Sequence, residues 1–99
     1  MDTVTAEPTT VGEMLREEFM RPMGITPQRL AEEMGFSCRM LERVLGNKRR
    51  LSVDEAWRLS EILQIGDTFW LDLQAAHDRW EARMMTLAKE KGTRGTLLQ

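Results

Sequence analysis

Residues 26–50 read TPQRLAEEMGFSCRMLERVLGNKRR, and this stretch decides the fold. It predicts two helices of about eight residues each, joined by the turn Gly35-Phe36-Ser37. Thr26 caps the first helix, and Pro27 stands at its first position, where a missing N–H costs nothing. Ser37 caps the second helix in the same way. Two short helices joined by such a turn are typical of a helix-turn-helix motif, here over residues 27–46.

The apolar residues of this stretch fall on one side of the predicted helix pair. The side chains expected inside are Leu30, Met34, Phe36, Leu41 and Val44. Ala31 is the small residue that a steep helix crossing needs, and Gly35 allows the positive φ of the turn. The residues left facing outward are Cys38, Arg39, Glu42 and Arg43. An ordinary helical hairpin in a small bundle would show the same pattern, so both alternatives stay open.

The distribution of charge favours DNA binding. The whole chain has a net charge of −2, yet residues 37–50 contain five basic residues and one acid, Glu42. A solvated surface also collects Lys and Arg, but these cations lie on the second helix and the loop directly after it. A DNA-binding motif needs cations there, because the flanking backbone holds phosphates while the helix reads base edges. We therefore expect double-stranded DNA as a partner.

The rest of the chain predicts further helices and no strand, because no stretch alternates apolar and polar residues. A flexible arm is expected over residues 1–9, followed by a helix from Thr10 to about Arg21 that Pro22 and Gly24 stop. The capping box Ser52-x-x-Glu55 begins a further helix, which ends near Gly66. Asp67 caps a last helix, which runs to about Lys91. The 99 residues suffice for one all-α domain, expected over residues 10–78. Residues 79–99 are expected to extend the last helix and end in a loose tail.

The last predicted helix carries an apolar stripe, which consists of Phe69, Leu73, Trp80, Met84 and Leu87. A helix of about 22 residues is about 33 Å long, more than the small core can cover. We expect Trp80, Met84 and Leu87 to form a dimer or partner surface, because a DNA-reading homodimer places its recognition helices about 34 Å apart. In the alternative, the helix bends or frays after Asp78 and folds these residues back.

Catalytic and metal sites are not expected. The single cysteine, Cys38, excludes an internal disulfide, and with one histidine, His77, the good metal ligands are too few. No Ser-His-Asp set or Gly-rich phosphate loop is present, so we expect neither an enzyme nor a cofactor. We interpret Cys38 as a small residue that permits close approach rather than a redox sensor. The absence of a signal peptide and of an apolar run of about 20 residues predicts a cytoplasmic protein.

Five short motifs carry a resemblance to a known family: Gly12-Glu13-x-Leu15-x-Glu17-Glu18-Phe19, Gly24-Ile25-Thr26, Arg29-Leu30-Ala31, Asn47-Lys48-Arg49 and Phe69-Trp70-Leu71-x-Leu73-Gln74. From about Gly12 to Asp78 the sequence resembles the HigA-type antitoxins, within the lambda-repressor-like (Cro/C1, or XRE) helix-turn-helix proteins. The resemblance implies a five-helix DNA-binding fold and a homodimer on a palindromic operator. It also implies that the protein neutralises a HigB-type ribosome-dependent ribonuclease toxin, which is a second candidate for the apolar stripe.

On this interpretation the residues facing bases are Ser37, Cys38, Arg39, Glu42 and Arg43, and those holding phosphates are Gln28, Arg29, Asn47, Lys48 and Arg49. The chain departs from the family at Thr10-Val11, where His-Pro is usual, at Cys38, where glutamine is common, and at Glu42, where a small hydroxyl residue is common. A carboxylate facing DNA either accepts from cytosine N4 or repels a phosphate, so the operator sequence does not carry over. The alternatives are a stand-alone Cro/C1-type repressor without a toxin and a helical protein–protein adaptor.

Overall fold

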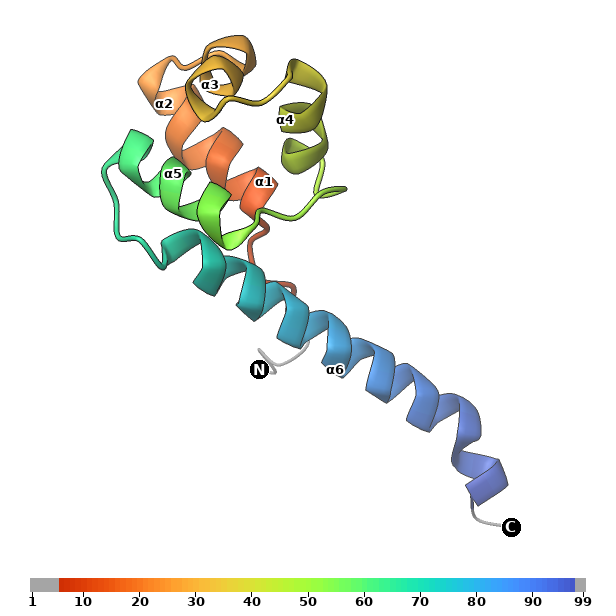
Figure 1. The fold of residues 1–99 in the computed structure, drawn as a ribbon. Helices are drawn as coiled ribbons and strands as arrows, with labels where there is room; N and C mark the ends of the chain where they lie inside the picture. Colours follow the sequence, from red (N-terminus) through yellow and green to blue (C-terminus); the bar gives the residue numbers. More distant parts are fainter. Residues whose placement is uncertain (1–5, 98–99) are drawn as a thin grey trace.

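The computed structural model describes residues 6–97, with side chains for residues 6–90, and all regular secondary structure in that range is helical (Figure 1). The elements are α1 (Val11–Met14), η2 (Leu15–Met20), α2 (Arg21–Met23), α3 (Pro27–Met34), α4 (Cys38–Leu45), α5 (Val53–Leu63) and α6 (Phe69–Leu97). Because α1, η2 and α2 follow one another without a break, residues 6–97 form five successive helices. The prediction of an all-α fold is confirmed.

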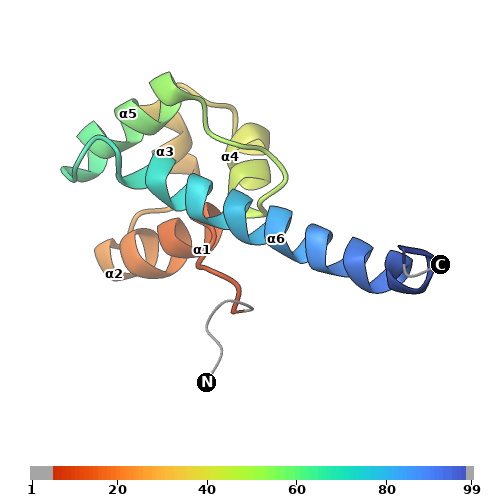
Figure 2. The same ribbon diagram turned by 90° about the horizontal axis from the view of Figure 1, so that it is seen from below.

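The five helices form a head and a projecting rod. Helices α1 to α5, here called the head, enclose the core, and the first turns of α6 pack against the head (Figures 1 and 2). The rest of α6 extends into solvent. The radius of gyration is consequently 17.0 Å, whereas a compact domain of this length has one of about 13 Å.

The first helix begins as predicted and ends two residues later than predicted. The Thr10 side chain caps it by accepting a hydrogen bond from the backbone N–H of Glu13. The helix passes through Pro22 to Met23, and Gly24 ends it with a left-handed φ of 67°. Residues Leu15–Met20 form π-helical turns, in which the N–H of Arg21 bonds to the carbonyl of Arg16. Sequence periodicity did not predict these wider turns, which lie directly before the proline.

The helix-turn-helix boundaries are confirmed. The hydroxyl oxygens of Thr26 and Ser37 accept hydrogen bonds at the starts of α3 and α4. Gly35 ends α3 with a φ of 74°, a left-handed conformation that glycine adopts without steric cost. The Ala31 side chain is 1% exposed, as expected of a small residue that lies where two helices cross.

The two later helices differ from the prediction at their ends. The capping box of Ser52 and Glu55 is present at the start of α5, but α5 ends at Leu63, where Gln64 adopts a φ of 58°. Helix α6 begins at Phe69, so Thr68 rather than Asp67 precedes it. It continues to Leu97, which contradicts the expected loose tail over residues 92–97. The end of that tail and the first five residues of the predicted arm lie outside the described residues.

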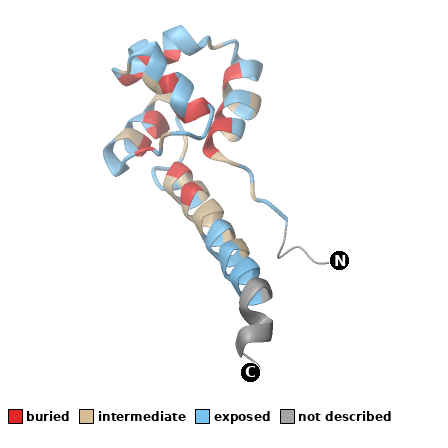
Figure 3. Cartoon of the chain, turned by 90° about the vertical axis from the view of Figure 1, so that its right-hand side faces the viewer, coloured by how far each residue is buried: buried red, intermediate tan, exposed pale blue. Residues whose placement is uncertain are grey.

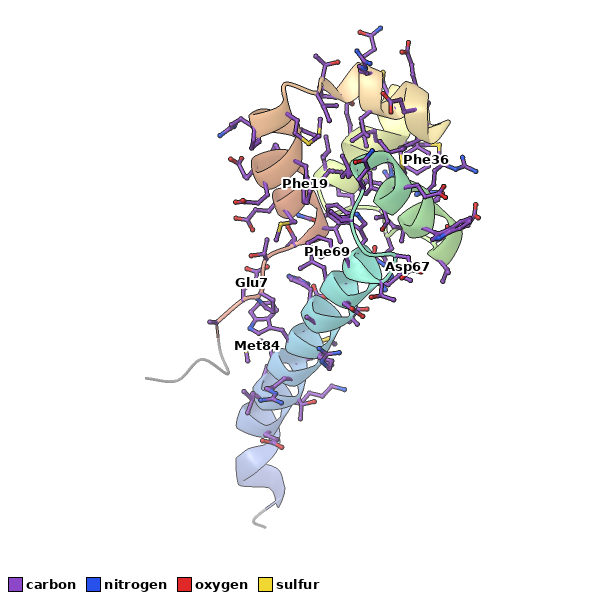
Figure 4. The ribbon with its side chains drawn as sticks, turned by 90° about the vertical axis from the view of Figure 1, so that its left-hand side faces the viewer. Glu7, Phe19, Phe36, Asp67, Phe69 and Met84 are labelled. Carbon is purple, nitrogen blue, oxygen red and sulfur yellow. The ribbon has the colours of Figure 1, made fainter. Side chains whose placement is uncertain are left out.

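The core joins the head to the first turns of α6. Leu15, Leu30 and Leu59 are each no more than 1% exposed, and Trp70 of α6 is fully buried. Phe19 of η2 lies against both Trp70 and Phe69, with ring centroids 5.5 and 6.2 Å apart (Figure 4). Burial then decreases along α6, and the side chains become exposed beyond the head (Figure 3). The predicted packing of Phe69, Trp70 and Leu73 on the preceding helices is confirmed.

Candidate nucleic-acid interface

Helix α4 presents one polar face to solvent. Leu41, Val44 and Leu45 anchor its other face in the core. The exposed residues are Cys38, Arg39, Glu42 and Arg43, the set that the sequence placed outward. The exposed Ser37 begins the same helix, and its Oγ accepts a hydrogen bond of 3.1 Å from the backbone N–H of Met40. The exposed face of α4 is therefore held on a rigid, well-anchored helix.

The side chains of this face make few contacts within the protein. Among the described residues, the side chains of Arg39 and Glu42 make no hydrogen bond or ion pair. Nη2 of Arg43 donates one long hydrogen bond, 3.4 Å, to the backbone carbonyl of Lys48. The N–H groups of Arg39 and Arg43 and the carboxylate of Glu42 are therefore available to an external ligand.

The loop after α4 is fixed by Asn47, which has a left-handed φ of 60°. Its Oδ1 accepts a hydrogen bond of 3.0 Å from the N–H of Gly12, and its Nδ2 donates one of 3.0 Å to Oγ1 of Thr10. The amide therefore holds the loop on the N-terminus of α1. The Asn47 amide is thus engaged within the protein, and its contact with a phosphate stays a prediction.

Arg49 is also occupied within the protein. Its two terminal nitrogens donate hydrogen bonds of 2.9 Å to the two carboxylate oxygens of Glu55, and its guanidinium carbon lies 5.2 Å from the centre of the Phe36 ring. The guanidinium lowers the pKa of Glu55 below its usual range, and the carboxylate raises the pKa of Arg49. Arg49 therefore ties the loop to α5 and the α3–α4 turn, and its contact with a phosphate stays a prediction.

The other predicted phosphate contacts are exposed. Gln28 lies in the first turn of α3, and Lys48 lies in the loop after α4. Arg29 pairs with Glu33 at 3.3 Å, but its side chain is 73% exposed, so water and a phosphate both have access to it. Of the five residues assigned to phosphates, Gln28, Arg29, Asn47 and Lys48 are exposed and Arg49 is half-buried, but only the first two and Lys48 have side chains that are not held by the loop contacts above.

Other polar contacts that support the α3–α4 unit were not predicted. Nη1 of Arg16 donates to the carbonyl of Leu45 at 3.0 Å, and Nη1 of Arg58 donates to the carbonyl of Met34 at 2.9 Å. These two arginines satisfy carbonyls at the ends of α4 and α3, which have no partner within their own helices. The side chains come from η2 and α5, so spacing within the motif gives no signal for them.

A second group of contacts ties the segment after the loop to α6. Gln74 is buried, and its amide accepts a hydrogen bond from the N–H of Leu51 at 2.6 Å and donates one to the carbonyl of Leu51 at 3.1 Å. Nη1 of Arg50 lies 2.6 Å from Oδ1 of Asp78. The only sequence signal was Gln74 itself, the last residue of the Phe69–Gln74 motif.

The predicted partner surface on α6 lies partly beyond the head. Trp80 and Met84 are half-buried, and Leu87 is 44% exposed. The ring of His77 lies 5.4 Å from that of Trp80, and its Nε2 lies 2.7 Å from a carboxylate oxygen of Glu7. The N-terminal segment thus touches α6 before the helix leaves the head.

The described part of the chain contains no cluster of three or more His, Cys, Asp or Glu residues placed to hold a metal ion. Within the same residues, no helix is sufficiently long and apolar to span a bilayer.

Comparison with known proteins identifies the family, although no family model matches the chain. The chain is 41% identical over 76 residues to Antitoxin HigA-1 of Vibrio cholerae, and the aligned stretch covers 77% of this chain and 71% of that protein. It is 35% identical over 81 residues to the HTH-type transcriptional regulator YbaQ of Escherichia coli, and this alignment covers 82% of this chain and 72% of that protein. The structure of the antitoxin GraA in complex with its operator is similar at a TM-score of 0.76 and 34% identity, covering 88% of each chain. With the α3–α4 geometry in place, these similarities show that the chain belongs to the HigA-type antitoxins, a family of helix-turn-helix transcriptional regulators.

Proposed function

We propose that this protein is an antitoxin that binds its own operator DNA and represses transcription, with α4 in the major groove. The observation that carries the proposal is the polar face of α4, where Arg39 and Glu42 have no partner among the described residues. The related antitoxin GraA has a structure in complex with its operator. Residues 10–78 would form the DNA-binding domain, and residues 79–99 would extend it.

In the proposed complex the two kinds of DNA contact come from different elements. Bases are read by the α4 face, namely Ser37, Cys38, Arg39, Glu42 and Arg43. Phosphates are held by Gln28 and Arg29 at the start of α3 and by Lys48 after α4. Arg49 and Asn47 act indirectly, because they set the conformation of the loop that carries Lys48.

The DNA-binding proposal is tested with the DNA upstream of the protein's own gene in a gel-shift experiment, against a random duplex of equal length. We expect tight binding to the upstream DNA and weaker, strongly salt-dependent binding to the random duplex. Equal affinity for both duplexes would contradict a sequence-reading function and favour the adaptor alternative.

We propose that the toxin partner is a HigB-type ribonuclease. The support is the identity to Antitoxin HigA-1 of Vibrio cholerae. The YbaQ similarity supports the second candidate, a stand-alone repressor. Co-expression of the protein with the product of the adjacent gene separates them: rescue of growth supports the antitoxin, and an adjacent product that is harmless by itself supports the stand-alone repressor.

We further propose that the protein is a homodimer joined along the outer stripe of α6, which contains Trp80, Met84 and Leu87. Leu87 is 44% exposed and continues the half-buried stripe of Trp80 and Met84, and a contiguous apolar stripe left in contact with water is typical of an interface. The cytoplasm is the proposed location, because operator DNA is there.

A further inference from the structure

Helix α4 carries one carboxylate in the middle of its exposed face. At about 100° per residue, the order around the helix is Cys38, Glu42, Arg39 and Arg43, over an arc of about 140°. Glu42 and Arg39 therefore occupy the centre of the arc, and Cys38 and Arg43 its margins. Residues 37–50 contain five basic residues and no other acid. Glu42 thus faces the same ligand as the arginines around it.

Glu42 does not use these neighbouring arginines as partners. Elsewhere on the surface, glutamates do pair with arginines four residues away, as Glu17 does with Arg21 at 2.8 Å. The Glu42 carboxylate makes no such contact among the described residues, although Arg39 lies three positions before it and Arg43 one after it. Its acceptor capacity is therefore available to the ligand of this face.

The groove of DNA offers a carboxylate one favourable partner. A carboxylate only accepts hydrogen bonds, and phosphates, guanine O6 and N7 and thymine O4 are acceptors that repel it. Adenine presents the N6 donor beside the N7 acceptor. Cytosine presents the N4 amino donor without an adjacent acceptor on the same base. The chemistry of the carboxylate thus selects cytosine among the four bases.

We propose that Glu42 is a specificity-determining residue that reads cytosine in the operator half-site. This inference rests on the DNA-binding function proposed above. The carboxylate selects in two ways, since it accepts from cytosine N4 and repels the acceptor edges of the competing bases. Arg39, beside it in the arc, reads guanine by donating to O6 and N7.

The experiment compares the wild-type chain with Glu42→Gln and with the control Glu18→Gln. Glu18 is an exposed glutamate of η2 without a hydrogen bond or ion pair among the described residues, so its substitution changes the net charge equally. Each protein selects binding sites from a pool of duplexes with a random 20-base-pair core, and the bound duplexes are sequenced. Circular dichroism melting verifies that each variant is folded.

We expect wild type and Glu18→Gln to select sites with cytosine at one position of each half-site. Glu42→Gln should select adenine there, because a glutamine amide bonds adenine N6 and N7 together. Its affinity for the wild-type site should fall about 5- to 150-fold. A second variant, Glu42→Ala, should lose the preference at that position without gaining another.

The contrary outcomes are distinct. If wild type selects a defined site and both Glu42 variants select that same site, the specificity proposal is overturned while the DNA-binding function stands. If wild type selects no sequence from the pool, the proposed function itself fails.

Discussion

At the scale of single residues, Arg39 and Lys48 are both exposed cations, but they belong to different parts of the proposed interface. Arg39 lies at the centre of the α4 face, and in the proposed complex its side chain reaches base edges. Arg39→Ala should cost about 1–3 kcal/mol in operator binding and relax the preference at one base pair. The measurement is a titration of the operator and of single-base variants of it.

Lys48 lies in the loop after α4, and in the proposed complex its side chain reaches the phosphate backbone. Lys48→Ala should weaken binding to all sequences and make the slope of log K against log salt shallower by about one unit. The two substitutions serve as controls for each other. Equal losses on operator and random DNA for Arg39→Ala would show that α4 is not the recognition helix.

The Arg49–Glu55 pair predicts a pH dependence of stability. The pKa of Glu55 is lowered in the folded protein, chiefly by the hydrogen bonds from Arg49. Such a group stabilises the fold above its unfolded pKa of about 4.3, and that contribution is lost as pH falls through the lower folded value. Glu55→Gln should therefore destabilise the protein by roughly 1 kcal/mol at neutral pH, and the difference should vanish in acid.

Glutamine at this position can still complete the capping box with Ser52, so Glu55→Gln isolates the ion pair from the cap. Urea denaturation of wild type and variant between pH 7 and pH 3 provides the measurement. A stability difference that stays constant over this range would show that the pair contributes nothing through its charge.

The α4 face could be predicted from sequence, whereas the uses of Asn47 and Arg49 could not. Helical periodicity suffices to place Arg39 and Glu42 outward, because the pattern lies within one helix. Asn47 bonds Thr10 and Gly12, and Arg49 bonds Glu55, residues that belong to other elements. Only the packing of α1 and α5 around the loop reveals that these two polar side chains hold the protein together.

At the scale of helices, the contact between α1 and α4 depends on Gly12. A Cβ added to Gly12 would overlap the backbone carbonyl oxygen of Leu45, and only a backbone shift could relieve that overlap. Gly12→Ala should therefore separate α1 from α4. It should destabilise the fold by about 1–3 kcal/mol, which is the typical cost of overpacking a core.

The matched control is Gly66→Ala, because an added Cβ at Gly66 meets no atom within 4 Å. Thermal melting followed by circular dichroism should show a large loss for Gly12→Ala and little change for Gly66→Ala. A Gly12→Ala variant that melts like the control would mean that α1 does not need this close approach to α4.

The helix starts illustrate what local sequence determines. Thr10, Thr26 and Ser37 each begin a helix as predicted, because a capping hydrogen bond spans only three residues. The π-helical turns of η2 and the passage of the helix through Pro22 were not predicted. Phe19 of η2 meets Trp70 of α6, a contact between distant parts of the chain about which local propensity contains no information.

At the scale of the whole molecule, the proposed dimer predicts that the outer half of α6 is dispensable for folding but not for operator binding. Truncation after Asp78 retains the buried Trp70 and Gln74 and removes the stripe beyond them. The truncated chain should be a folded monomer whose operator affinity falls steeply, while binding to random DNA changes less. Analytical sedimentation and a gel shift measure the two effects.

Single substitutions make the same test without shortening the chain. Met84→Glu places a charge in the stripe, whereas Ala82→Glu places one on an exposed position about 160° away around α6. Met84→Glu should dissociate the dimer, and Ala82→Glu should leave it intact. A truncated chain that sediments as a dimer would place the interface on the head instead.

The anchoring of α6 by Gln74 has a mechanical consequence for the length of the operator. From Gln74 to Leu97 the helix is a lever about 35 Å long, so a tilt of about 6° at its root moves the tip by about 3.5 Å. One base pair of DNA rises about 3.4 Å. In the proposed dimer joined along α6, the distance between the two α4 helices is therefore fixed to within one base pair only if α6 cannot tilt where it leaves the head. In the proposed dimer, the two hydrogen bonds between the Gln74 amide and the backbone of Leu51 would contribute to this stiffness, and the spacing of the two half-sites would then depend on one buried glutamine.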